Sequence, residues 1–76
     1  MVHAFIMVKT AAGMSEDLLG DLRELESVSD AHIVAGNYDI ITEVDVDEVY
    51  EVLEVVSSGI QSFDGVTDTK TYIAMD

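Results

Sequence analysis

Residues 31–44, AHIVAGNYDIITEV, join two apolar runs through the turn Gly36-Asn37-Tyr38-Asp39. Glycine and asparagine tolerate positive φ, which a tight connection between strands often needs. The turn is also the one place in the chain where glycine, exposed amides and a carboxylate come together. The stretch therefore predicts a hairpin of two strands. The turn is the first candidate for a functional site, with a purely structural turn as the alternative.

The elements on either side of the hairpin follow a regular order. Val2–Val8 is apolar at both odd and even positions and rich in strand formers, which predicts a buried strand. Leu18, Leu22 and Leu25 recur at helical spacing and predict a helix over Glu16–Glu26, with Ser15 as its N-cap. The remaining predicted elements are strands at Val28–Ala35, Asp39–Val46 and Val66–Met75 and a second helix at Asp47–Gln61.

The second helix has one clear apolar stripe. The residues expected to face the core are Val49, Leu53, Val56 and Ile60, with Val52 and Val55 off the stripe. Asp45 or Asp47 is expected to cap its N-terminus.

The order βαββαβ predicts an α+β, ferredoxin-like fold, in which a four-stranded antiparallel sheet carries both helices on one face. Such a sheet should alternate apolar and polar residues. The first strand instead offers Phe5 and Met7 on the face opposite Ile6 and Val8. Because exposed apolar faces mark interfaces, we expect a dimer that forms through the open sheet face.

Composition limits the classes of function. The chain has 76 residues, enough for one domain, and no cysteine for disulfides or thiolate metal sites. A net charge of −13 argues against direct contact with nucleic acid or an anionic membrane, while 49% hydrophobic residues argue against disorder. The acidic excess predicts a halophilic protein, with an ordinary acidic protein as the alternative.

The sequence contains few motifs that indicate a cellular location or a catalytic site. The N-terminus lacks a basic region and no apolar run approaches ~18 residues, so we expect a cytoplasmic protein. His3 and His32 lie mid-strand without a nucleophile motif, and no metal-ligand spacing or phosphate loop is present. We therefore expect no catalytic residue, no metal and no cofactor.

Two threonines form a further candidate site. Thr69 and Thr71 are two residues apart, so their hydroxyls share one face of the last strand. They reflect either the strand propensity of threonine or a pair of hydrogen-bond donors that line a pocket for a carboxylate or amine. Val55, Ser58 and Gly59 of the second helix would border the same region, unless they face solvent.

Two segments carry a resemblance to a known family. Val34–Ile41 resembles the Gly-x-x-Asp hairpin, and Phe63–Thr71 the Gly-Val-x-x-Thr-x-Thr entry to the last strand, of the RAM domain. The RAM domain is the effector-binding domain of the Lrp/AsnC (feast/famine) transcription regulators. The resemblance covers nearly the whole chain, with Asp64 where the family usually has proline. The family's helix-turn-helix is absent, so the chain resembles a stand-alone RAM domain over residues 1–76, without a DNA-binding domain.

The resemblance implies sheet-to-sheet dimers, often assembled into tetramers of dimers or larger rings. It also implies that a small ligand, typically an amino acid, binds between dimers near the hairpin. The matching residues form a hairpin wall of Gly36, Asn37, Tyr38 and Asp39 and a strand wall of Thr69 and Thr71. Asp39 either pairs with the ligand's ammonium or holds the turn through its own backbone bonds.

Three functions follow as hypotheses. The first is a non-catalytic amino-acid-sensing module in transcription regulation or amino-acid metabolism. The second is an interaction subunit that co-assembles with full-length Lrp/AsnC regulators. The third is a small dimeric ferredoxin-like enzyme, which would need a roomy pocket between its sheet and its helices.

Overall fold

Four strands and two main helices follow the predicted order in the computed structural model, which describes residues 1–76. The bounds are β1 Val2–Thr10, α1 Ser15–Arg23, β2 Val28–Ile33, β3 Ile40–Val46, α2 Val49–Glu54 and β4 Val66–Ile73. Helix α2 continues into the π-helical turn η1, Val55–Gly59, and the 3₁₀ turn η2, Ile60–Ser62. The largest difference from the predicted ends is at α1, which stops at Arg23 rather than Glu26.

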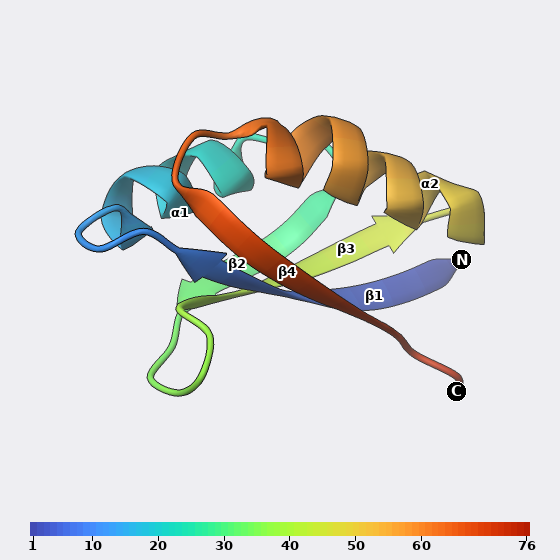
Figure 1. The fold of residues 1–76 in the computed structure, drawn as a ribbon. Helices are drawn as coiled ribbons and strands as arrows, with labels where there is room; N and C mark the ends of the chain where they lie inside the picture. Colours follow the sequence, from blue (N-terminus) through green and yellow to red (C-terminus); the bar gives the residue numbers. More distant parts are fainter.

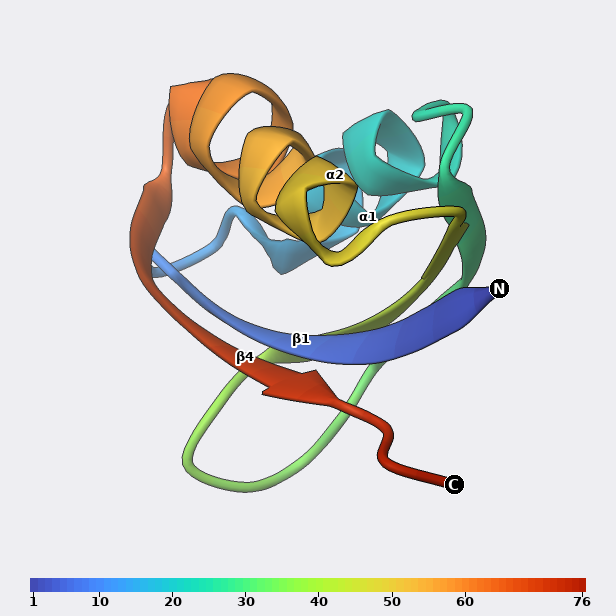
Figure 2. The ribbon, with the colours of Figure 1, turned by 90° about the vertical axis from the view of Figure 1, so that its right-hand side faces the viewer.

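The sheet is antiparallel throughout, with the strand order β2-β3-β1-β4. Both helices cover one face, and the other face is open (Figures 1 and 2). This arrangement confirms the predicted α+β, ferredoxin-like fold. None of the helices is long and apolar enough to cross a membrane.

The core fills the layer between the sheet and the helices. Side chains at alternate positions of β1 and β3 meet the inner faces of α1, α2 and the η turns. The buried cluster consists of Ala4, Ile6, Val8, Leu18, Leu22, Ile40, Val44, Val46, Val52, Val56 and Ile60. Thr42 is buried among them at 0% exposure, and its hydroxyl oxygen has no hydrogen-bond partner.

The predicted helix caps are wrong. Met14 occupies the N-cap position of α1 and makes no side-chain cap bond. The Ser15 hydroxyl instead lies 2.9 Å from the Thr10 hydroxyl, which ties the helix start to the end of β1. At α2 the N-cap is Glu48, again without a side-chain bond, because Asp45 belongs to β3 and contacts His3.

The inward stripe of the second helix is also partly wrong. Val49 and Leu53 are 49% and 60% exposed, whereas Val52, expected off the stripe, is fully buried. The π turn explains the difference. The extra residue of a π turn shifts the phase of everything after it by about 100°. Ile60 therefore lies on the same side as Val52, and the residues on the predicted stripe before the π turn face outward.

The connection between β2 and β3 is a longer loop than the predicted tight turn. It spans residues 34–39, and the Val34 amide donates to the Asp39 carbonyl at 2.8 Å. Gly36 has a positive φ of 159°, and no residue other than glycine has positive φ. Of the two residues expected to allow positive φ in this connection, Gly36 adopts it and Asn37 does not.

A second turn does need its glycine. Gly65, just before β4, has φ +96°, and a Cβ there would lie 2.7 Å from the Met14 sulfur. The Gly65 carbonyl accepts the Ala11 amide at 2.7 Å, which joins this turn to the loop before α1. Conformation and space both restrict the position to glycine.

Arg23, the only arginine in the chain, links α1 to β2. Its guanidinium donates to the Ala31 carbonyl from Nε at 3.2 Å and from a terminal nitrogen at 2.8 Å. Ala31 is fully buried beneath the helix, so the bond fixes the edge strand of the sheet.

The open face of the sheet is less apolar than predicted. Phe5, Met7 and Ile41 alternate with charged groups on this face, because the strand register brings His3 opposite Asp45 and Phe5 opposite Glu43. Asp30 and His32 of β2 add a second pair of charged groups. The face is therefore a mixture of apolar side chains and hydrogen-bonded pairs.

Candidate functional site

The loop of residues 34–39 projects below the open face of the sheet (green in Figures 1 and 2). Asp39 holds it there. One oxygen of its carboxylate accepts the Thr10 amide at 2.8 Å and the Thr10 hydroxyl at 3.3 Å, and its amide donates to the Val8 carbonyl. The carboxylate thus anchors the loop to the end of β1 rather than to the loop's own backbone.

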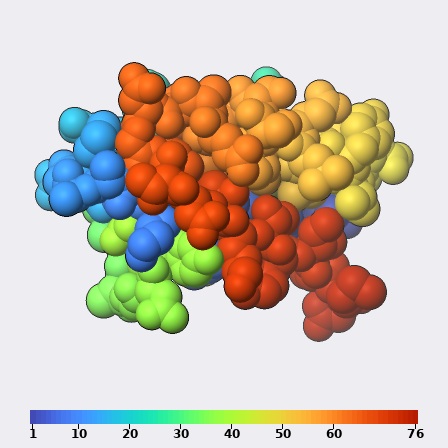
Figure 3. Space-filling view, in the orientation of Figure 1, coloured from blue at the N-terminus to red at the C-terminus, as the bar shows by residue number.

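A cavity of about 480 Å³ lies between the loop and the sheet. Loop residues 34–38 form one wall, and Met7 of β1 with Lys70 and Tyr72 of β4 form the other. Figure 3 shows the green loop and the red C-terminal end of the chain projecting downward, with a notch between them. Of the four residues expected in the hairpin wall, Gly36, Asn37 and Tyr38 line the cavity and Asp39 does not.

Two lysines are close to this loop. The Lys9 ammonium donates to the Asn37 carbonyl at 2.8 Å and lies 6.0 Å from the centre of the Tyr38 ring. Lys70 lines the cavity on the opposite wall. Two of the 3 Lys and Arg residues in a chain of net charge −13 therefore lie beside this loop.

The threonine wall lies on the other face of the sheet. Thr69 pairs with Val8 and Thr71 with Ile6, and both partners are buried under the helices. Lys70 and Tyr72 alternate with them and point to the open face. Within one chain, Thr69 and Thr71 therefore cannot contact a ligand held in the hairpin cavity.

The three helix residues expected beside these threonines all fall in the π turn η1. Val55 is half-buried against the core, Ser58 is exposed, and Gly59 faces Leu25, whose Cδ1 would lie 3.6 Å from an added Cβ. Thr69 contacts the next turn instead, where its hydroxyl accepts the Gln61 amide at 2.9 Å. A shallow hollow of about 260 Å³ adjoins Gln61 and Thr69, and the π-turn residues do not line it.

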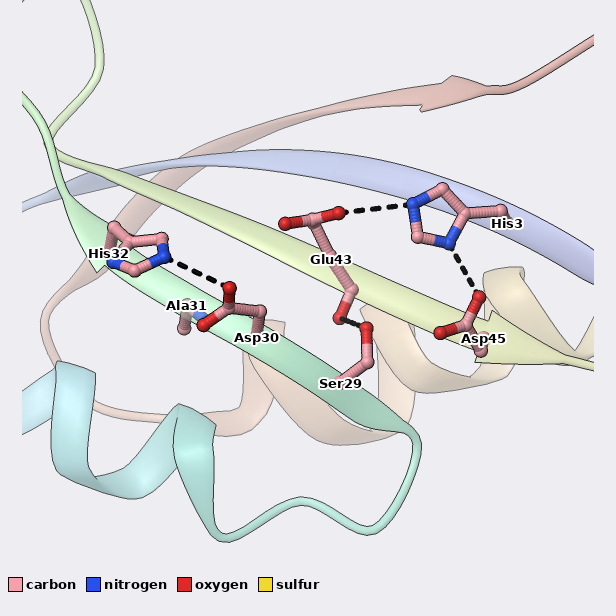
Figure 4. A network of polar contacts seen from close by, with 7 residues as sticks. All are labelled: His3, Ser29, Asp30, Ala31, His32, Glu43 and Asp45. Carbon is pink, nitrogen blue, oxygen red and sulfur yellow. Dashed lines mark hydrogen bonds and ion pairs between the residues drawn. The ribbon is translucent and has the colours of Figure 1, made fainter.

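Sequence reasoning missed a polar network on the open face (Figure 4). His3 lies between two carboxylates, with Nδ1 2.5 Å from Asp45 Oδ1 and Nε2 3.1 Å from Glu43 Oε1. On β2, His32 Nε2 lies 3.0 Å from Asp30 Oδ2. The i, i+2 spacing of Glu43 and Asp45 places both on one face, but only the strand register identifies His3 as their partner.

The contacts shift the pKa values of these groups. The hydrogen bond with Asp45, aided by its charge and by Glu43, raises the pKa of His3 above its usual value despite partial desolvation. The bond from His3 lowers the pKa of Asp45, and the bond from His32 lowers that of Asp30. The contacts therefore favour a charged imidazolium beside charged carboxylates.

The fold and the loop define a small ferredoxin-like domain of the α+β class. The sequence profile described as the Lrp/AsnC ligand binding domain matches residues 3–76. The chain belongs to the Lrp/AsnC ligand-binding domain family. The match occupies nearly all of the 76 residues.

Known relatives extend this finding. The leucine-responsive regulatory protein of Haemophilus influenzae is 24% identical over 70 residues, which make up 92% of this chain and 42% of that protein. The chain thus spans less than half of this curated relative. TTHA0845 from Thermus thermophilus is 32% identical with a TM-score of 0.96 over 100% of this chain and 95% of that one. Escherichia coli AsnC is 26% identical with a TM-score of 0.92 over 99% of this chain and 51% of that one.

Proposed function

We propose that the protein is a non-catalytic, oligomeric amino-acid-sensing module that takes part in transcription regulation or amino-acid metabolism. The observation that carries the proposal is the β2–β3 loop. Asp39 fixes its base to β1, while Gly36 and Asn37 remain exposed and able to approach a ligand. Exposed backbone amides at such a loop suit a carboxylate, the group that every amino acid carries.

The ligand contacts two subunits in this proposal. Thr69 and Thr71 lie on the helix side of β4 and the loop lies below the open face, so one chain supplies only half of the expected site. The loop of one dimer and the threonine wall of a neighbouring dimer complete it. Two chains pack through their open sheet faces to form each dimer, and dimers assemble into a larger ring.

The layer between the sheet and the helices supports a binding role over catalysis. An enzyme of this fold would place its pocket there, and the buried cluster of leucine, isoleucine and valine fills that space. Both cavities lie outside it.

Calorimetry with the twenty amino acids at millimolar concentration tests the proposal. Thr71 and Lys70 are neighbours on β4 that point to opposite faces. Thr71→Val is expected to abolish binding, because it removes a hydroxyl from the threonine wall. Lys70→Met is the matched control on the other face of β4. If the ligand lies between dimers, this variant is expected to bind as tightly as the unaltered chain.

Reversed behaviour of the two variants would place the ligand in the cavity beside Lys70. If no amino acid binds, co-assembly with a full-length helix-turn-helix relative becomes the function to test, by co-purification. A halophilic protein would show binding only in concentrated salt, so the titrations are best run in molar KCl.

A further inference from the structure

His3 occupies a position that only its charged form satisfies. Each of its ring nitrogens contacts a different carboxylate, Asp45 at 2.5 Å and Glu43 at 3.1 Å. A neutral imidazole has one N–H donor and one acceptor nitrogen, whereas the imidazolium has two donors. Deprotonation of His3 therefore leaves a lone pair facing one of the two carboxylates.

Glu43 and Asp45 of β3 and Phe5 of β1 contact His3, whereas the charged groups of the whole open face come from all four strands. Phe5 packs edge-on against the imidazole at 4.9 Å between ring centres. The titratable and charged groups on the open face are Glu43 and Asp45 of β3, Asp30 and His32 of β2, Lys70, Tyr72 and Asp68 of β4, and Lys9 of β1. Both histidines and two of the 3 Lys and Arg residues of the chain thus lie on this face.

The charges of the face come close to balance when His3 is protonated. Lys9, Lys70 and the His3 imidazolium then oppose the four carboxylates of Asp30, Asp68, Glu43 and Asp45. Elsewhere the acids dominate and produce the net charge of −13. A nearly neutral, partly apolar face is the part of this surface that a second copy of the same chain can approach without strong repulsion.

We propose that the open sheet face binds a second copy of this chain most tightly while His3 is protonated, so that proton binding controls the dimer. This inference rests on the sheet-to-sheet dimer of the proposed function. Dimerisation removes His3 and its two carboxylate partners, Glu43 and Asp45, from water in each chain. A buried carboxylate without a donor is costly, and removal of one partner from a buried charge pair is strongly unfavourable.

The sign of the linkage follows from the geometry. His3 has a raised pKa in the single chain, because Asp45 and Glu43 favour its charged form. Burial of the cluster against another copy increases the need for the second donor and raises the pKa further. The dimer is then favoured below the histidine range and weakens as the pH rises through the pKa of His3.

Sedimentation velocity in molar KCl, from about pH 6 to about pH 8.5, measures the effect. Each dimer holds two His3 side chains, so a pKa one unit higher in the dimer weakens the dimer by about 100-fold across the titration. His3→Gln keeps one amide donor but does not titrate, and its dimer affinity is expected to be independent of pH. His32→Gln is the control and keeps the pH dependence, because His32 contacts one carboxylate whereas both ring nitrogens of His3 contact carboxylates.

A measurement on the unaltered chain guards against misfolding of the variants. The His3 ring proton, followed by NMR at low and high protein concentration, is expected to titrate at higher pH in the dimer. Equal pKa values at both concentrations overturn the proposal, as does pH dependence that persists in His3→Gln. If the unaltered chain forms a dimer whose affinity does not depend on pH, the proton linkage is wrong but the sheet-to-sheet dimer stands. If the chain is a monomer at every pH, both are wrong.

Discussion

The buried Thr42 hydroxyl offers the sharpest test of the core. Thr42 is fully buried in β3, opposite Ile6 of β1 and Ala31 of β2, and its Oγ1 has no hydrogen-bond partner. A buried hydroxyl without a partner costs roughly 1–3 kcal/mol. Valine has nearly the same shape and also prefers strands, so Thr42→Val replaces the hydroxyl with a methyl group without a cavity or a clash.

We expect Thr42→Val to raise the free energy of unfolding by about 1–2 kcal/mol. For a domain of this size each kcal/mol corresponds to about 4–8 °C in Tm. Urea denaturation in molar KCl measures the change, at one fixed protein concentration because an oligomer's stability depends on concentration. Thr71→Val is the matched control on the same side of the sheet, where the side chain is only half-buried, and its effect is expected within about 0.5 kcal/mol. A loss of stability in Thr42→Val would mean that the hydroxyl has a partner in solution and would refute the reasoning.

Three further predictions concern the assembly, the charge and the turns. Phe5→Lys is expected to convert the dimer to monomer, because it introduces a charge at the centre of the open face. Leu53→Lys adds the same charge at an exposed position of α2 and is expected to leave the dimer intact. Light scattering measures the molar mass of both variants. Folding is expected to strengthen with salt, because molar KCl shortens the Debye length to ~3 Å around a chain of charge −13; circular dichroism that is unchanged between dilute and molar KCl would contradict this. Gly65→Ala is expected to destabilise the chain by more than about 1 kcal/mol, because of its φ of +96° and the Met14 contact. Gly20→Ala, at an exposed position of α1, is expected to stabilise it by about 0.5–1 kcal/mol in the same denaturation assay.

The order of the elements could be predicted from the sequence because each has its own hydrophobic period. Leu18 and Leu22 of α1 lie in the core as their spacing predicts, whereas only the structure shows that Ala4, Ile6 and Val8 of β1 face the helices. Helix α2 departs from its period at the π turn, whose extra residue exposes Val49 and Leu53. Periodicity assumes a constant number of residues per turn, so no count of apolar positions could detect this change of phase.

The candidate site was harder to predict because it depends on which strands pair. Local sequence identifies the Gly36–Asp39 loop, and alternation shows that Thr69 and Thr71 share a face. Neither reveals that the loop and the threonines lie on opposite sides of the sheet, since that follows from the β1–β4 register. The anchoring of Asp39 by Thr10 likewise joins segments 29 residues apart in the chain.

The few basic residues of this acidic chain affect how its structure responds to concentrated salt. Arg23 and Lys9 both donate to neutral backbone carbonyls, of Ala31 and Asn37, and not to carboxylates. A short hydrogen bond to a carbonyl depends on local geometry, whereas dissolved ions weaken attraction between separated charges. The attachment of the edge strand to α1 and of the loop to β1 should therefore persist over a wide range of ionic strength. Concentrated salt can relieve the mutual repulsion of the acids without loosening the two ties that fix the periphery of the sheet.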